Sequence, residues 1–161
     1  MEFDYRRSAV IFRPAKEKGG IGRDRPHGTP AFTLRYVLRR MPNHPTASAR
    51  IGGEAFVAAF DTGQYGTVYA DTGTQSRLVE AGAIARPRRD GDDAISRLQR
   101  WSLDGHRLPV VSHVGMSARP FAAARGTGIA ELRIVTVGYG LLHRYRKVWD
   151  WSRGEIVFYP R

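Results

Sequence analysis

The 161-residue sequence contains no cysteine, which excludes disulfides and thiolate metal sites. It also lacks any apolar run of about 18 residues, and residues 1–7 lack the apolar core of a signal peptide. We therefore expect no secretion, no membrane partner, and a cytoplasmic location if Met1 is the native start. The chain is long enough to bury one full hydrophobic core, which favours a single domain.

Acidic residues are scarce: 15 Asp and Glu stand against 26 Lys and Arg, a formal net charge of +11. Such an excess suggests nucleic acid as a partner. The positive residues are scattered, however, and the densest cluster, at residues 86–89, is followed by Asp90, Asp92 and Asp93. This mixture is typical of a solvated loop, which we expect at residues 87–93. We therefore expect no nucleic-acid partner.

Motifs for metals and phosphates are also absent. The glycine-rich residues 19–22 lack the Lys-Ser/Thr that follows in a phosphate-binding loop. The five histidines have no metal-ligand spacing with carboxylates or with one another. They are His27, His44, His106, His113 and His143. The sequence therefore predicts neither a metal nor an organic cofactor.

Residues 3–14 and 149–160 repeat one pattern without gaps: aromatic-Asp-aromatic, a polar turn with Arg, an apolar run ending in Phe, one residue, then Pro. Each copy predicts a β-hairpin. Two explanations are open: a coincidence between edge hairpins, or a repeat in which residues 1–14 are the last hairpin of a preceding lobe. Residues 15–30 are polar and rich in Gly and Pro, which predicts a linker. Residues 31–161 then form one lobe.

Short runs with a period of two predict an all-β fold with one or two short helices. Residues 32–38 and 46–51 alternate between apolar and polar positions. Gly52 and Gly53 join the second of these runs to another apolar run, which predicts a hairpin. Apolar positions at residues 74–83 predict a short helix.

The apolar run at residues 56–60 ends on Asp61, Thr62 and Gly63. A carboxylate at the mouth of a buried strand is poorly solvated. Such a group favours a shifted pKa and a catalytic role. Asp61 is therefore the candidate catalytic residue.

A second Asp-Thr-Gly occurs at residues 71–73, so the tripeptide alone does not discriminate. There it opens the predicted helix, and Thr72 with Gln75 fits a capping box. We therefore interpret Asp71 as structural.

Taken in order, these features resemble a retropepsin-like aspartic protease domain. The resemblance rests on the strand ending at Asp61, the short helix after it, residues 134–145 with their apolar pair, glycine and leucines, and the hairpin at Asp150. It covers residues 32–161. It implies a closed, all-β acid-protease barrel lobe that acts as an aspartic endopeptidase on a peptide or protein substrate, without metal or organic cofactor.

The resemblance also implies residue roles. Asp61 would be the catalytic carboxylate, Thr62 would lock its loop against a partner loop, and Gly63 would permit close backbone approach. Val137 and Gly138 would be a packing strand. The chemistry needs two aspartates, so the second comes from a homodimer partner or from a missing N-terminal lobe of a two-lobed enzyme. The repeated hairpin favours the missing lobe.

Two residues depart from the family pattern. Gln64 stands where the family usually has Ala, Ser or Thr, and Thr136 weakens the apolar pair before Gly138. Gln64 supports an alternative, a catalytically silent protein- or peptide-binding domain of the same fold. Residues 88–107 are the candidate flap over the substrate, with Trp101 as its apolar contact.

Overall fold

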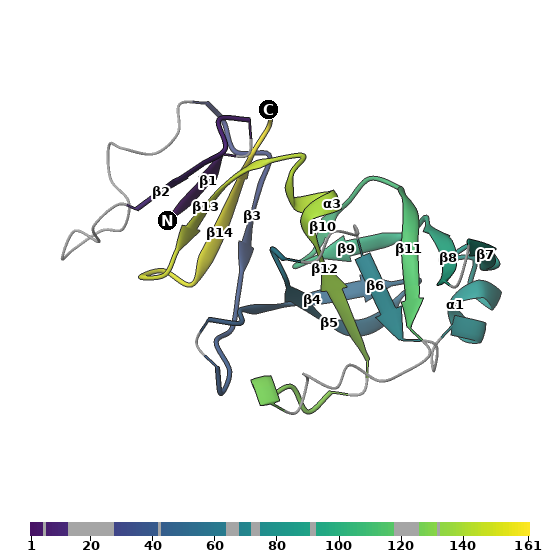
Figure 1. Ribbon diagram of the computed structural model, residues 1–161. Coiled ribbons are helices and arrows are strands. Elements are labelled where there is room, and N and C mark those ends of the chain that lie inside the picture. Colours follow the sequence, from purple (N-terminus) through teal and green to yellow (C-terminus); the bar gives the residue numbers. More distant parts are fainter. Residues whose placement is uncertain are drawn as a thin grey trace.

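The computed structural model describes residues 1–4, 6–12, 28–41, 43–63, 68–71, 75–90, 93–117, 126–131 and 133–161. Within these residues strands dominate, as expected for an all-β protein, and they form two sheets (Figure 1). The helices are short: α1 (Gln75–Glu80) and α3 (Tyr139–Leu142). No helix among the described residues is long and apolar enough to cross a membrane.

The larger sheet has nine strands. In spatial order they are β10 (His106–Arg107), β9 (Trp101–Leu103), β4 (Thr46–Ile51), β5 (Glu54–Phe60), β12 (Ile134–Val137), β6 (Val68–Asp71), β11 (Val111–Ser117), β8 (Asp93–Leu98) and β7 (Arg88–Asp90). The expected closed barrel is not formed, because within the described residues β10 and β7 do not pair with each other. Both end strands are short and charged, and such strands resist further pairing.

The smaller sheet has five strands. Their order is β2 (Ala9–Ile11), β1 (Glu2–Asp4), β13 (Arg146–Asp150), β14 (Glu155–Tyr159) and β3 (Phe32–Arg35). All four pairings are antiparallel. The two ends of the chain therefore meet in one sheet, where β1 lies beside β13 (Figure 1).

β4 and β5 form the hairpin that the sequence predicts. The apolar residues Ala47, Ala49 and Ile51 are buried, while the polar residues between them are exposed. Gly52 and Gly53 make the two-residue turn with φ of +61° and +91°. Glycine adopts this left-handed backbone without steric cost, and the turn fixes the hairpin register.

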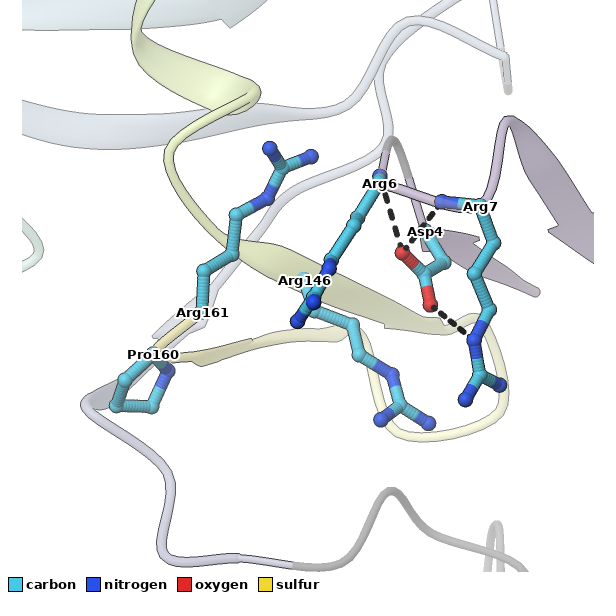
Figure 2. Close-up of a pocket in the computed structure, with 6 residues that line it drawn as sticks. All are labelled: Asp4, Arg6, Arg7, Arg146, Pro160 and Arg161. Carbon is cyan, nitrogen blue, oxygen red and sulfur yellow. Dashed lines mark hydrogen bonds and ion pairs between the residues drawn. The ribbon is translucent and has the colours of Figure 1, made fainter.

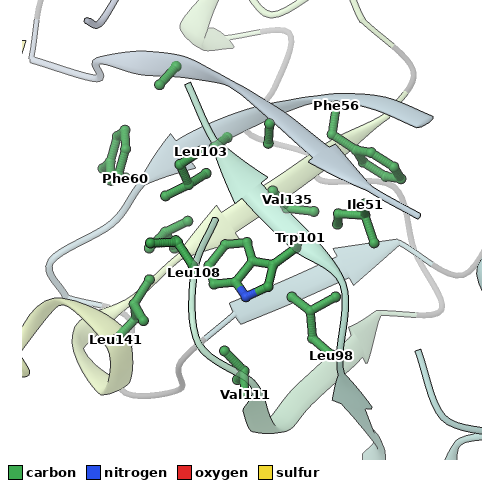
Figure 3. Close-up of a cluster of buried hydrophobic side chains, with 14 of the residues drawn as sticks. Ile51, Phe56, Phe60, Leu98, Trp101, Leu103, Leu108, Val111, Val135 and Leu141 are labelled. Carbon is green, nitrogen blue, oxygen red and sulfur yellow. The ribbon is translucent and has the colours of Figure 1, made fainter. Parts of the chain in front are cut away.

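The main hydrophobic core lies on one face of β4, β5 and β9 and includes Trp101, which is 3% exposed (Figure 3). The indole Nε1 of Trp101 donates to the carbonyl oxygen of Pro109 at 2.9 Å. Trp101 is therefore a core residue and not the surface contact of a flap. The candidate flap at residues 88–107 spans β7 to β10, which all belong to the larger sheet.

Two local predictions have different outcomes. α1 lies inside the predicted helix at residues 74–83, with Leu78 fully buried on its inner side. The loop expected at residues 87–93 instead contains β7, in which Arg88 lies opposite Ile95 of β8. Charged side chains are well suited to such an edge strand, because they discourage pairing with another chain.

The two hairpins of the smaller sheet share one register. Asp4 lies opposite Ala9 in the first hairpin, and Asp150 lies opposite Glu155 in the second. One shift of 146 positions relates both pairs. The repeat seen in the sequence therefore extends to the strand pairing.

The turns of these hairpins are also alike. Oδ1 of Asp4 accepts hydrogen bonds from the backbone N–H groups of Arg6 and Arg7, at 3.1 and 3.3 Å (Figure 2). Oδ1 of Asp150 accepts one from the N–H of Arg153 at 3.2 Å. Arg7 and Arg153 are related by the same shift. The similarity of the two hairpins therefore includes one turn contact, from Arg7 to Asp4 and from Arg153 to Asp150.

Arg146→Met is expected to lower the free energy of unfolding by about 2 kcal/mol. The side chain of Glu2 is fully buried, and Nε of Arg146 donates to its Oε1 at 2.5 Å. Removing the partly exposed arginine takes a short charge-assisted hydrogen bond away from a buried carboxylate. Urea unfolding measures the change. Arg7→Met is the control, because the largely exposed Arg7 lies 3.8 Å from Asp4 and forms only a weak ion pair. This change should alter stability by no more than about 0.5 kcal/mol. Equal losses in both variants would contradict this account.

Candidate active site

β5 and β12 run parallel and side by side at the centre of the larger sheet. Their last residues, Phe60 and Val137, lie opposite each other. Parallel strands end at the same edge of a sheet, so Asp61 after β5 and Gly138 after β12 leave the sheet together. The N–H of Asp61 donates to the carbonyl oxygen of Val137 at 3.0 Å. This hydrogen bond extends the ladder by one residue and fixes the backbone of Asp61.

The side chain of Asp61 is held by its own loop. Its Oδ1 accepts a hydrogen bond from the N–H of Gly63 at 2.9 Å. An aspartate that bonds the backbone two residues later forms an Asx turn, which orients the carboxylate. A Cβ atom on Gly63 would lie 3.4 Å from Oδ1 of Asp61, at the edge of ordinary contact. Glycine therefore leaves space beside the carboxylate.

Asp61, Thr62 and Gly63 are exposed in the single chain. The sequence predicted a poorly solvated carboxylate, and in this respect the prediction is wrong for Asp61. The apolar run before it is buried as expected, but the loop leaves the sheet at its edge. Asp61 is thus held by its own loop and by β12, and it is exposed at the edge of the sheet.

The residues before and after the site are fixed by packing. The ring of Phe60 packs edge-on against that of Trp149 in β13, with centroids 5.8 Å apart. Trp149 also stacks on Trp151, at 6.1 Å. The aromatic-Asp-aromatic hairpin thus supports the last residue of β5. The sequence marked these aromatic residues only as part of a repeat, and their long-range contact with Phe60 left no local signal.

β12 continues directly into α3 through Gly138, whose carbonyl oxygen accepts from the N–H groups of Leu141 and Leu142, at 3.2 and 3.1 Å. Both leucines are buried, as is Val137. This buried segment therefore anchors β12, whose Val137 carbonyl oxygen accepts the hydrogen bond from the N–H of Asp61.

No family model matches the chain, and no curated protein matches its sequence. Several solved structures are similar to it, including the following three. A retropepsin-like aspartic protease from Rickettsia conorii has 15% identity and a TM-score of 0.48, over 79% of this chain and 87% of that chain. The retroviral protease-like domain of Ddi1 from Leishmania major has 16% identity and a TM-score of 0.44, over 80% and 96%. Basic 7S globulin from soybean has 10% identity and a TM-score of 0.48, over 78% of this chain and 41% of that chain.

The chain resembles retropepsin-like aspartic protease domains. At these low identities and TM-scores, no residue role is carried over from those proteins. The roles predicted for Asp61, Thr62 and Gly63 stay predictions. Gln64, the main departure from the retropepsin-like pattern, lies outside the described residues.

The second Asp-Thr-Gly occupies a different position in the larger sheet. Asp71 ends β6, a strand between β12 and β11, and lies opposite Ser117. The capping arrangement predicted with Thr72 lies outside the described residues. Asp71 is thus a strand residue, whereas Asp61 lies in a loop.

Two histidines, His106 and His143, make contacts with neighbouring residues. The ring of His106 stacks on Phe32 with centroids 5.5 Å apart, and Nδ1 of His143 lies 3.0 Å from the carbonyl oxygen of Tyr139. Within the described part of the chain, no group of three or more His, Asp or Glu residues is arranged to hold a metal ion.

A cavity of about 380 Å³ lies at one end of the smaller sheet (Figure 2). Four arginines and one aspartate contribute to its lining, together with Pro160. The aspartate, Asp4, is already used by the hairpin turn, and Arg146 is paired with Glu2. These two lining residues therefore stabilise the hairpins of the smaller sheet.

Proposed function

We propose that this chain is one catalytic lobe of an aspartic endopeptidase. The observation that carries the proposal is the geometry of Asp61, an exposed carboxylate fixed at the end of a central strand by Val137 and Gly63. Its backbone position is determined by two neighbouring strands, while its side chain remains accessible. Such a group suits a reaction in which it must meet both a water molecule and a second carboxylate.

The proposed mechanism needs two aspartates a few ångströms apart. Two neighbouring carboxylates cannot both ionise easily, so the pair shares one proton. The ionised member takes a proton from water, whose oxygen attacks the peptide carbonyl carbon, while the protonated member donates to the carbonyl oxygen. Proton transfer to the amide nitrogen then allows the C–N bond to break. The two apparent pKa values belong to the pair and not to Asp61 alone.

The second aspartate would come from a symmetry-related Asp61 in a homodimer or from an N-terminal lobe that completes a two-lobed enzyme. The repeated hairpin supports the second source, because a homodimer of single lobes has no need of a second copy of the final hairpin. Thr62 would contact the partner loop, and Gly63 would allow the two loops to approach closely. A peptide or protein segment would be the substrate.

The second candidate function is a catalytically silent domain that binds a protein or peptide. Gln64 favours it, because a large amide directly after Gly63 would stand close to the attacking water. Under the protease proposal, the chain assembled as a homodimer or with its second lobe cleaves members of a diverse peptide library. The same assembly binds a statine-type transition-state mimic more tightly than the matching substrate peptide. Mass spectrometry measures the cleavage, and calorimetry measures the binding of the mimic. Paired protein that neither cleaves nor binds the mimic would favour the silent domain.

A further inference from the structure

We propose that the outer edge of β2 binds an extended strand from a second lobe of the same fold, in the register that β3 uses on β14. β2 ends the five-stranded sheet, and no strand pairs with its outer edge within the described residues (Figure 1). Val10 in β2 is 49% exposed, and Phe12 directly after β2 is 78% exposed. An open edge with exposed apolar side chains favours the addition of a strand.

β1 and β13 meet about a local two-fold axis. Glu2 lies opposite Val148, and Phe3 lies opposite Lys147. The shift of 146 positions that relates the two hairpins carries Glu2 onto Val148, which is its own pairing partner. The pairing thus maps onto itself, as a two-fold axis requires. Under this axis, the outer edge of β2 is the equivalent of the edge of β14 that β3 covers.

The contacts of β14 show what such an edge binds. The N–H of Tyr36 donates to the carbonyl oxygen of Gly154 at 2.9 Å. Because residues of a strand face alternate neighbours, Ile156 and Phe158 also turn their backbone groups toward β3. The ring of Phe32 in β3 stacks on Phe158, with centroids 4.5 Å apart.

Val10 and Phe12 are the equivalents of these two β14 residues. Their amides are therefore the ones that an added strand would bond. In β3, Leu34 lies opposite Ile156. We infer that the partner strand places an aliphatic residue opposite Val10 and an aromatic ring over Phe12.

A second copy of this chain does not supply this strand. In each copy β3 is already paired with β14, and the edge of β13 is already covered by β1. A lobe that has its own β3-like strand and ends in the β1–β2 hairpin supplies it. By the same two-fold axis, that lobe would also carry the equivalent of Asp61. The edge inference itself does not depend on catalysis, and it stands if the proposed protease activity fails.

A tethered strand tests this inference. A copy of residues 28–38 is fused to Met1 through a flexible linker of about 15 residues, long enough to cross the short strands of this sheet. Tethering raises the effective concentration of the added strand to the millimolar range. We expect the amides of Val10 and Phe12 to exchange with solvent at least about tenfold more slowly than in the unfused chain. Hydrogen exchange followed by NMR measures this.

The matched control carries the same fusion with asparagine in place of the copies of Phe32 and Leu34 in the added strand. It should leave the two amides unprotected, and Phe12→Lys in the original fusion should abolish the protection. Two results would overturn the inference. One is an original fusion whose exchange rates equal those of the control. The other is an unfused chain in which both amides become protected as concentration rises and sedimentation shows dimers, since β2 would then pair with itself.

Discussion

Asp61→Asn abolishes peptide hydrolysis, with kcat/KM lowered by roughly 10³-fold or more, if the protease proposal is correct. Asparagine has nearly the same shape as aspartate, and its side-chain oxygen can still accept the N–H of Gly63. The loop therefore keeps its geometry. The amide cannot take a proton from water or share one with a second carboxylate, so the variant loses chemistry and not structure. Initial rates on a cleaved library peptide, across acidic to neutral pH, measure the loss.

Asp71→Asn is the matched control, since it makes the same change in the other Asp-Thr-Gly. Asp71 ends strand β6 and lies outside the proposed catalytic loop. We expect its kcat/KM to stay within about threefold of the parent. Urea unfolding of both variants separates lost activity from lost fold. Hydrolysis that survives Asp61→Asn, or that disappears equally in Asp71→Asn, would remove Asp61 from the mechanism.

Local signals in the sequence predicted the elements that carry the site. The apolar run before Asp61 and the two glycines at residues 52–53 are short-range patterns, and both β5 and its hairpin with β4 follow from them. The leucines after Gly138, which entered only through the family resemblance, lie in α3. Strand, turn and helix boundaries are set by neighbouring residues, which explains why these predictions agree with the structure.

Long-range features could not be predicted in this way. The hydrogen bond from Asp61 to Val137 and the contact of Phe60 with Trp149 join segments that are distant in the sequence. The exposure of Asp61 depends on what the whole fold places above its loop, and the placement of Trp101 in the core depends on the pairing of β9 with β4. Periodicity identifies strands, but it does not identify their neighbours.

Lys147 is the least expected consequence of this long-range arrangement. It is fully buried in β13, and its Nζ donates to the carbonyl oxygens of Leu142 and Tyr145, at 2.7 and 3.5 Å. The ammonium also lies 5.9 Å from the centre of the Phe3 ring. Burial, with a smaller contribution from the positive charge of Arg161, lowers the pKa of Lys147 to about 7. In the unfolded chain a lysine has a pKa of about 10.4.

The stability of the protein should therefore rise with pH between about 7 and 10. Below the folded pKa, both states hold the proton and the full cost of burying the ammonium is present. Above it, the folded protein releases the proton while the unfolded chain keeps it, so the unfolded state binds more protons and the free energy of unfolding increases with pH. The slope contributed by one lysine is at most about 1.4 kcal/mol per pH unit.

Lys147→Met removes this titration and keeps most of the side-chain volume. We expect the stability of the parent relative to this variant to increase by about 1 kcal/mol per pH unit from pH 7.5 to 9.5, measured by urea unfolding. All other titrating groups cancel in the difference. Arg153→Met removes a half-exposed side chain of a residue type that stays protonated in folded and unfolded proteins alike, so its stability difference from the parent should stay constant. A flat difference for Lys147→Met as well would mean that the buried amine keeps an ordinary pKa, and that the contacts with Leu142 and Tyr145 offset the whole cost of burial.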